Sequence, residues 1–163
     1  MRTAPRSGTR GIALMEALVA ILLLSVSALA FAALQMRGLS ASGSTMWRSK
    51  ATILAYEMAD RMRANHDAVV SGQYNSLTSP TSVTDCGTSS ACSPARMALL
   101  DYSQWSTELG QTLPGGTGVV CLDGTPDDGK TGEPACDGSG MLVVKVFWSE
   151  RGVPSRLTIP VRP

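Results

Sequence analysis

The feature that most constrains this chain is an apolar run from Ile12 to Leu34 in which Glu16 is the only charged residue. At a rise of about 1.5 Å per residue, a helix of this length crosses the roughly 30 Å hydrocarbon core of a bilayer. A carboxylate at the centre of such a helix costs about 2.5–3.5 kcal/mol, and less near an end. We therefore expect a membrane-spanning helix whose single acid is kept for a partner.

The flanks of the apolar run predict its orientation. Arg2, Arg6 and Arg10 precede it and only Arg37 lies close behind it, so the N-terminus is expected in the cytoplasm and the rest of the chain in the periplasm or outside. Residues 1–11 are short, basic and polar, which is typical of a targeting leader. An ordinary secretory signal has a shorter apolar core of about 7–15 residues, whereas here helical sequence continues past the run.

Length and charge limit what the rest of the chain can be. With 163 residues, one globular domain fits beside the membrane segment. The formal net charge is +1 and the basic residues form no patch, so the sequence carries no nucleic-acid footprint.

All four cysteines lie C-terminal to the apolar run, in polar and Gly-rich sequence, which is typical of an exported domain. Their spacing favours two small disulfide loops, Cys86–Cys92 and Cys121–Cys136, over the two long-range pairings. Free or metal-bound thiols are less favoured, because no C-x-x-C pair is present and the only histidine, His66, is distant in sequence.

Residues 35–70 are expected to continue the helix with an amphipathic pattern. Apolar side chains recur there at helical spacing and charged residues occupy the rest of the circumference. The apolar positions are Trp47, Ala51, Leu54, Met58 and Met62. Gly38 and Gly43 mark a weak point between the apolar and amphipathic parts, where a bend is expected.

The remaining residues predict a small α+β domain. After a loop over 71–92, Ser93 and Pro94 read as the N-cap and first residue of a helix that runs to about Leu113. Three apolar segments then read as strands of an antiparallel sheet that covers the exposed half of the long helix. These segments are 118–122, 141–148 and 156–161, and Pro160 places the last one at an edge.

Several motifs resemble those of one family. Gly11 followed by "IALMEALVAILLLSVSALA" resembles the class III signal of type IV prepilins, in which a glutamate stands five residues into the mature chain, as Glu16 does when counted from Ile12. "LAYEMADRMRAN", "DCGTSSACSPARMALLDYSQW" and "LPGGTGVVC" are similar to the minor pilins of the PilV family. The chain thus resembles a type IV pilus minor pilin over most of its length.

The resemblance implies a pilin-like fold and a structural role. It implies cleavage between Gly11 and Ile12 by prepilin peptidase, N-methylation of Ile12, and insertion through the inner-membrane assembly platform beside other minor pilins and the major pilin. The family most often has phenylalanine at the first mature position, where this chain has isoleucine. The expected division is leader 1–11, transmembrane and assembly helix 12–34, amphipathic continuation 35–70, and periplasmic head 71–163.

Glu16 has a physical explanation in that setting. Cleavage frees an ammonium group at Ile12 within the membrane, and a neighbouring subunit staggered by a few residues could place Glu16 beside it. Because an unpaired charge in low dielectric is so costly, the pair is expected to set axial register between subunits.

Catalytic and ligand-binding interpretations are weak. The chain lacks G-x-S-x-G, Walker and G-x-G-x-x-G motifs, so no enzyme activity, cofactor or metal is expected. The acid-rich segment 123–137 does not fit an EF-hand, since Ala135 stands where the bidentate glutamate belongs. We expect it to be a solvated loop closed by a disulfide. His66 is expected to be solvated. The alternatives are a type II secretion pseudopilin and a single-pass periplasmic sensor or enzyme with an uncleaved anchor.

Overall fold

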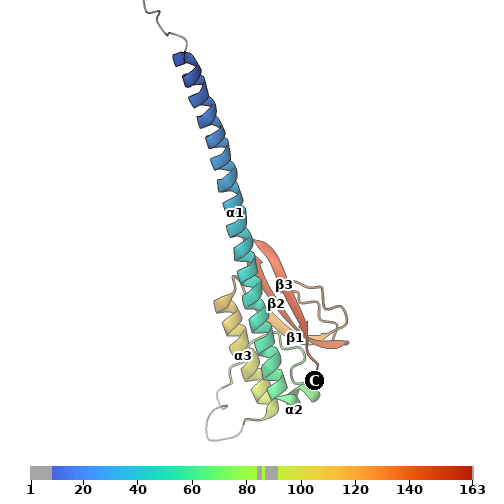
Figure 1. The fold of residues 1–163 in the computed structure, drawn as a ribbon. Helices are drawn as coiled ribbons and strands as arrows, with labels where there is room; N and C mark the ends of the chain where they lie inside the picture. The colour runs from blue at the N-terminus through green and yellow to red at the C-terminus, as the bar shows by residue number, and fades with distance from the viewer. Residues whose placement is uncertain (1–8, 84–85, 87–91, 163) are drawn as a thin grey trace, which may run out of the picture. The chain divides into compact units, whose positions relative to one another are not determined.

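The computed structural model describes residues 9–83, 86 and 92–162. The chain divides into two compact units, one ending at Gly43 and the other, the head unit, beginning at Ser44. Helix α1 (Thr9–Ala64) contributes to both, and the remaining elements all belong to the head unit (Figure 1). The helix is uninterrupted at Gly38 and Gly43, and the division between the units falls directly after the second of these.

Helix α1 ends six residues before the expected position. The sequence predicted one helix to residue 70, but the structure stops α1 at Ala64 and begins a separate short helix, α2 (His66–Val70). Asn65 separates them with φ −111° and ψ 50°. Its side-chain amide donates to the Tyr74 hydroxyl at 3.1 Å and to the Pro94 carbonyl at 2.9 Å. These tertiary hydrogen bonds outweigh the continued helical pattern.

The second predicted helix is observed as α3 (Pro94–Thr112), with Ser93 as its N-cap. The Ser93 hydroxyl accepts from the Arg96 amide at 3.4 Å, and proline occupies the first helical turn as expected. The buried face of α3 is Ala98, Asp101, Tyr102, Trp105 and Leu109. Met97 and Leu100 lie at the margin of this face and are only half-buried.

The three predicted strands form one antiparallel sheet in the order β1-β2-β3. They are β1 (Thr117–Asp123), β2 (Met141–Glu150) and β3 (Val153–Pro160). The predicted segments 141–148 and 156–161 left seven residues between them, but in the structure only Arg151 and Gly152 lie between β2 and β3, with φ values of 52° and 82°. Two consecutive positive φ angles are typical of the turn that closes two-residue hairpins. Pro160 lies in edge strand β3, as predicted.

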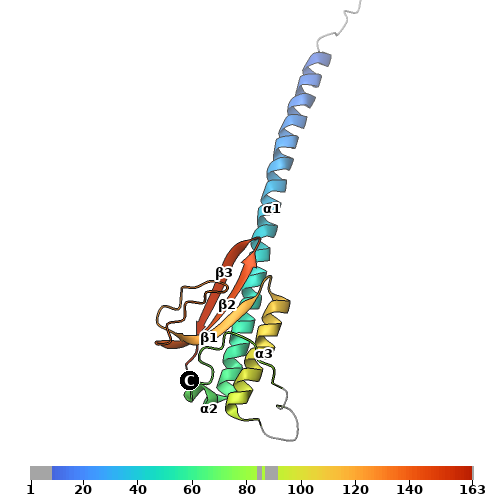
Figure 2. The same cartoon turned by 180° about the vertical axis from the view of Figure 1, so that it is seen from behind.

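The main core of the head unit joins α1, α3 and one face of the sheet. Figures 1 and 2 show α3 and the strands beside the last part of α1. The predicted face of α1 is confirmed: Ala51, Leu54, Met58 and Met62 are buried and Trp47 is half-buried against them. The Trp105 indole N–H donates to the Leu54 carbonyl at 2.8 Å, so α3 is fastened to α1 by a buried hydrogen bond. The pilin-like α+β fold predicted from the sequence is confirmed.

A smaller cluster lies on the other face of the sheet. It contains Val119, Cys121, Val143 and Phe147, with Cys136 packed against it. Cys136 comes from the long connection between β1 and β2, residues 124–140, which we call the β1–β2 loop. This loop therefore covers the sheet face opposite the helices.

Candidate functional site: the apolar helix and the surfaces of the head

The part of α1 in the first unit is apolar on all sides and has no covering within its own unit. The candidate membrane span begins at Ile12, and its most apolar 18-residue window has a mean hydropathy of 2.7 and is 0% buried. Large side chains all around the helix are exposed, Leu24 and Leu29 by more than 70%. A helix that is apolar on every side must be covered by lipid or by other helices.

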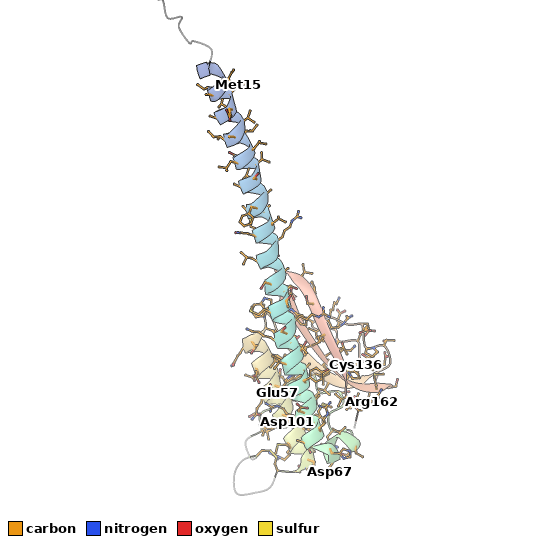
Figure 3. The ribbon with its side chains drawn as sticks, in the orientation of Figure 1. Met15, Glu57, Asp67, Asp101, Cys136 and Arg162 are labelled. Atoms are coloured by element: carbon orange, nitrogen blue, oxygen red, sulfur yellow. A yellow bond between two sulfur atoms is a disulfide. The ribbon has the colours of Figure 1, made fainter. Side chains whose placement is uncertain are left out.

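Glu16 interrupts this surface. Its carboxylate shares a shallow hollow on one side of α1 with Ile12, Met15, Val19, Ala20 and Leu23. Met15, labelled in Figure 3, marks this end of the helix. Within the described chain Glu16 makes no ion pair. An acid with only apolar neighbours in its own chain would need a partner from another molecule in order to be stable in lipid.

The two hydroxyls in the apolar segment are satisfied within the helix. Ser25 Oγ donates to the Ile21 carbonyl at 2.7 Å, and Ser27 Oγ donates to the Leu23 carbonyl at 2.8 Å. Side-chain hydroxyls that bond one turn back leave no unsatisfied donor in a hydrocarbon environment. Among the polar side chains of this segment, Glu16 therefore stands alone in requiring a partner.

The bond between Gly11 and Ile12 lies in the first turn of α1, which begins at Thr9. The first four N–H groups of a helix have no intrahelical partner, so this turn opens at little cost. Cleavage after Gly11 and methylation of Ile12 remain predictions.

The end of α1 is fastened to the head by a polar network. Arg61 Nη2 pairs with Glu57 Oε1 at 2.6 Å, and Arg61 Nη1 donates to Gln104 Oε1 at 2.8 Å. Asp101, which is nearly buried, accepts a 2.6 Å hydrogen bond from the Tyr74 hydroxyl, and Arg61 Nη1 lies 3.7 Å from its other oxygen. Figure 3 labels Glu57 and Asp101 side by side at this point. The network joins α1, α3 and the segment after α2.

Burial and this network shift the acid–base behaviour of the two buried tyrosines. Burial, reinforced by the hydrogen bond to Asp101, raises the pKa of Tyr74 well above its ordinary value. Burial raises the pKa of Tyr102 to about 12. A phenol with a raised pKa contributes stability that is complete below pH 10 and lost as the pH rises through its folded value.

The β1–β2 loop is held by a charge that the sequence analysis did not single out. Lys145 is entirely buried on β2, pairs with the equally buried Asp123, and lies 3.0 Å from Asp128 Oδ1. Its ammonium also donates to the Pro134 carbonyl at 2.9 Å. The segment was expected to be solvated, but Asp123 is fully enclosed.

The pKa of Asp123 reflects two opposed effects. Burial acts to raise it, but the Lys145 ammonium and the Thr125 amide outweigh burial and hold the pKa of Asp123 below its usual value. The single lysine inside the apolar run "MLVVKVFW" was the available signal for this pair, because a buried lysine almost always has an anionic partner.

Both cysteine pairs favoured by the spacing are present as disulfides. Cys86 is joined to Cys92, with the Cα atoms 5.1 Å apart, and Cys121 is joined to Cys136, with the Cα atoms 6.1 Å apart. The second disulfide fixes the β1–β2 loop to β1, and Cys136 is labelled in Figure 3. Together with Lys145 it holds the loop on the outer sheet face.

Comparison with protein families gives one match. Residues 33–103 match the family Tt1218-like, described as type IV pilin Tt1218. This stretch is similar to type IV pilin sequence. Comparison with curated proteins and with solved structures gives no match.

The type IV pilin match covers the polar network except Gln104, which lies one residue beyond the matched stretch. It includes "LAYEMADRMRAN", whose Glu57, Arg61 and Asn65 recur every fourth residue and hold α3 and Tyr74 on α1. The motif is thus a fastening between the helix and the head. The match to pilins supports a pilin role, and the exposed apolar helix fits the membrane anchor of a pilin.

The structure also places the remaining residues that the sequence analysis considered as possible ligands or binding residues. Among the residues that the structure describes, no three His, Cys, Asp or Glu side chains are placed to hold a metal ion. His66 is exposed at the start of α2. Trp105 and Trp148 are buried core residues, and the half-buried Trp47 stacks beneath Lys50 Nζ at 4.8 Å.

The part of α1 in the head unit also presents an exposed apolar row. Met46, Ile53 and Tyr56 are 46–66% exposed on the side of the helix opposite its buried face. Their spacing of seven and three residues places them on one line along the helix. This row gives the head unit a surface on which another helix can pack.

Proposed function

We propose that this chain is a minor pilin of the PilV type, which takes part in priming and assembling the type IV pilus. Before assembly it is held in the inner membrane by one helix, with its N-terminus in the cytoplasm and its head in the periplasm. Prepilin peptidase cleaves it between Gly11 and Ile12, and the new N-terminus on Ile12 is methylated. It then enters the pilus with other minor pilins, in contact with the major pilin and the assembly platform.

One observation carries this proposal: Glu16 is the single acid in the exposed apolar segment 12–34, and this segment continues directly into sequence that matches a type IV pilin family. A helix that serves only to anchor a protein in the membrane does not require this carboxylate. A partner ammonium of the kind released at Ile12 would compensate it, and in low dielectric each group strongly disfavours a subunit position that leaves the other unpaired. Glu16 would therefore set the axial register between neighbouring helices.

Two features of the head support a structural role. The exposed row of Met46, Ile53 and Tyr56 extends a helix-packing surface beyond the membrane segment. The Cys121–Cys136 disulfide and the buried Lys145 fix the β1–β2 loop of the head before it meets a partner. Surfaces ordered in advance lose less conformational entropy on binding.

Replacing the carboxylate without changing its shape tests the register role. We expect Glu16→Gln to be cleaved and inserted like the wild type but to lose co-purification with the other minor pilins from detergent-solubilised membranes. Ser25→Ala is the control, because the Ser25 hydroxyl is satisfied within its own helix. Normal co-purification and piliation with Glu16→Gln would remove the register role.

A further inference from the structure

A groove with an apolar floor and a basic rim lies at the end of the head unit where α1 ends. It consists of two adjoining hollows that share Val69, Val161 and Arg162. The larger has a volume of about 440 Å³ and extends to Leu142 and Met141 on β2, and the smaller reaches Met62 and His66. Figure 3 labels Arg162, and Asp67 of α2, at this end of the unit. We call the two hollows together the α1-end groove.

The edges of the α1-end groove expose large apolar side chains. Val70 is 67% exposed and Met141 is 51% exposed, and both line the larger hollow. Of the other large apolar side chains that the structure shows exposed in the head unit, three form the row on α1 and one, Val153, lies beside the β2–β3 turn. Paired apolar edges around a hollow are typical of a docking surface, whereas single exposed residues need no explanation.

The charges of the α1-end groove have one sign. Arg63, His66 and Arg162 line it, and no acidic side chain lines either hollow. Arg63 already pairs with Asp60. Arg162 makes no ion pair with any residue that the structure describes. The groove thus offers one cation beside an apolar floor, which complements an apolar segment that carries a carboxylate.

The floor of the groove is formed in advance. The Val161 amide donates to the Leu142 carbonyl at 2.8 Å, which fixes the end of the chain to β2. The Leu122 amide donates to Asn75 Oδ1 at 3.0 Å, which fixes two further lining residues to each other. Because these walls are already ordered, a ligand would not need to order them on binding.

We propose that the α1-end groove docks an apolar segment bearing an Asp or Glu side chain from a neighbouring pilin subunit. This inference rests on the proposed pilin function. Within the head unit, the groove lies about 30 Å along α1 from Ser44, given a rise of about 1.5 Å per residue. In a polymer built on side-by-side helices, the two ends of each head face the subunits before and after it along the axis. A groove at one end of the head is therefore placed to meet another head.

Photo-crosslinking in cells that carry the full pilus machinery tests the docking. The full-length chain carries p-benzoylphenylalanine at position 70, or at position 153 as the matched control, since Val70 and Val153 are 67% and 64% exposed. We expect position 70 to crosslink to another pilin, and mass spectrometry to map the crosslink to a segment with an acid near an apolar residue. Position 153 should give little product.

A charge change in the same background tests the role of Arg162. We expect Arg162→Glu to reduce the position 70 crosslink about fivefold or more, because it places a like charge opposite the partner's acid, while Arg162→Lys retains it. A crosslink to lipid, a crosslinked segment without an acid, equal products at positions 70 and 153, or no response to Arg162→Glu would overturn the inference. Failure of the pilin proposal is distinguishable, because it would appear as an unprocessed N-terminus.

Discussion

One helix, α1, behaves in two ways along its length. In the first unit its side chains are exposed on every side, and Leu24 is 72% exposed. In the head unit the same helix buries Ala51, Met58 and Met62 completely against α3 and the sheet. The difference shows where the chain supplies its own partner and where the partner must come from another molecule.

Each of the two units contains a carboxylate that is surrounded by apolar side chains. In the head, Asp123 is enclosed and its partner Lys145 comes from the neighbouring strand. In the first unit, Glu16 has no such partner within the described chain. A carboxylate in low dielectric needs a cation, and among the described residues Asp123 is paired with one whereas Glu16 is not. The missing cation is the physical basis for expecting an intermolecular pair at Glu16.

Breaking the internal pair should have the largest effect. Lys145→Met leaves Asp123 buried and unpaired, which should lower the free energy of unfolding by about 3–5 kcal/mol. Lys130→Met is the control, because Lys130 and its partner Glu133 are mostly exposed. Urea unfolding of the detergent-solubilised chain, followed by tryptophan fluorescence, reports on the head alone because all three tryptophans lie there. Equal unfolding midpoints for the two variants would contradict this account of the pair.

Truncating one leucine to alanine in each unit compares how much each unit contributes to the stability of the head. Leu109 is completely buried, so Leu109→Ala should lower the free energy of unfolding by about 2–5 kcal/mol. Leu24→Ala should leave the unfolding midpoint unchanged, since Leu24 is 72% exposed. Both variants can be compared in the same fluorescence experiment. A similar loss of stability with Leu24→Ala would show that the first unit is not independent of the head.

Acid should weaken the head by a smaller amount. The pKa of Asp123 is lower in the folded state than in the unfolded chain, so the stability it contributes is complete above the unfolded value of about 3.9 and is lost as the pH falls through the folded value. Urea midpoints should therefore decrease below about pH 4. In Asp123→Asn the decrease should be shallower, and an identical pH profile would exclude Asp123 as a cause.

Much of the fold was predictable because its signals are local. Apolar spacing predicted the buried face of α1, Ser93 and Pro94 predicted the start of α3, and short apolar segments predicted the strands. The end of α1 at Ala64 was not predictable, because Asn65 is held by Tyr74 and Pro94, which are distant in sequence. A tertiary hydrogen bond of this kind leaves no trace in helical periodicity.

Some parts of the candidate site could be predicted from the sequence and others could not. Glu16 and the cysteine pairs could be identified because each is unusual in its own sequence context. The pair between Lys145 and Asp123 could not be assigned, since five acids lie close together in 123–137 and only the register of β1 and β2 selects one. The α1-end groove is assembled from four separate segments, so no local pattern could indicate it.

The central claim is that Glu16 belongs to a mature chain that begins at Ile12, where a new ammonium group is available for pairing. Mass spectrometry of the N-terminal peptide, from protein extracted from membranes of cells with prepilin peptidase, tests it most directly. We predict an N-methylated terminus at Ile12. An intact Met1 terminus in those cells would contradict the claim.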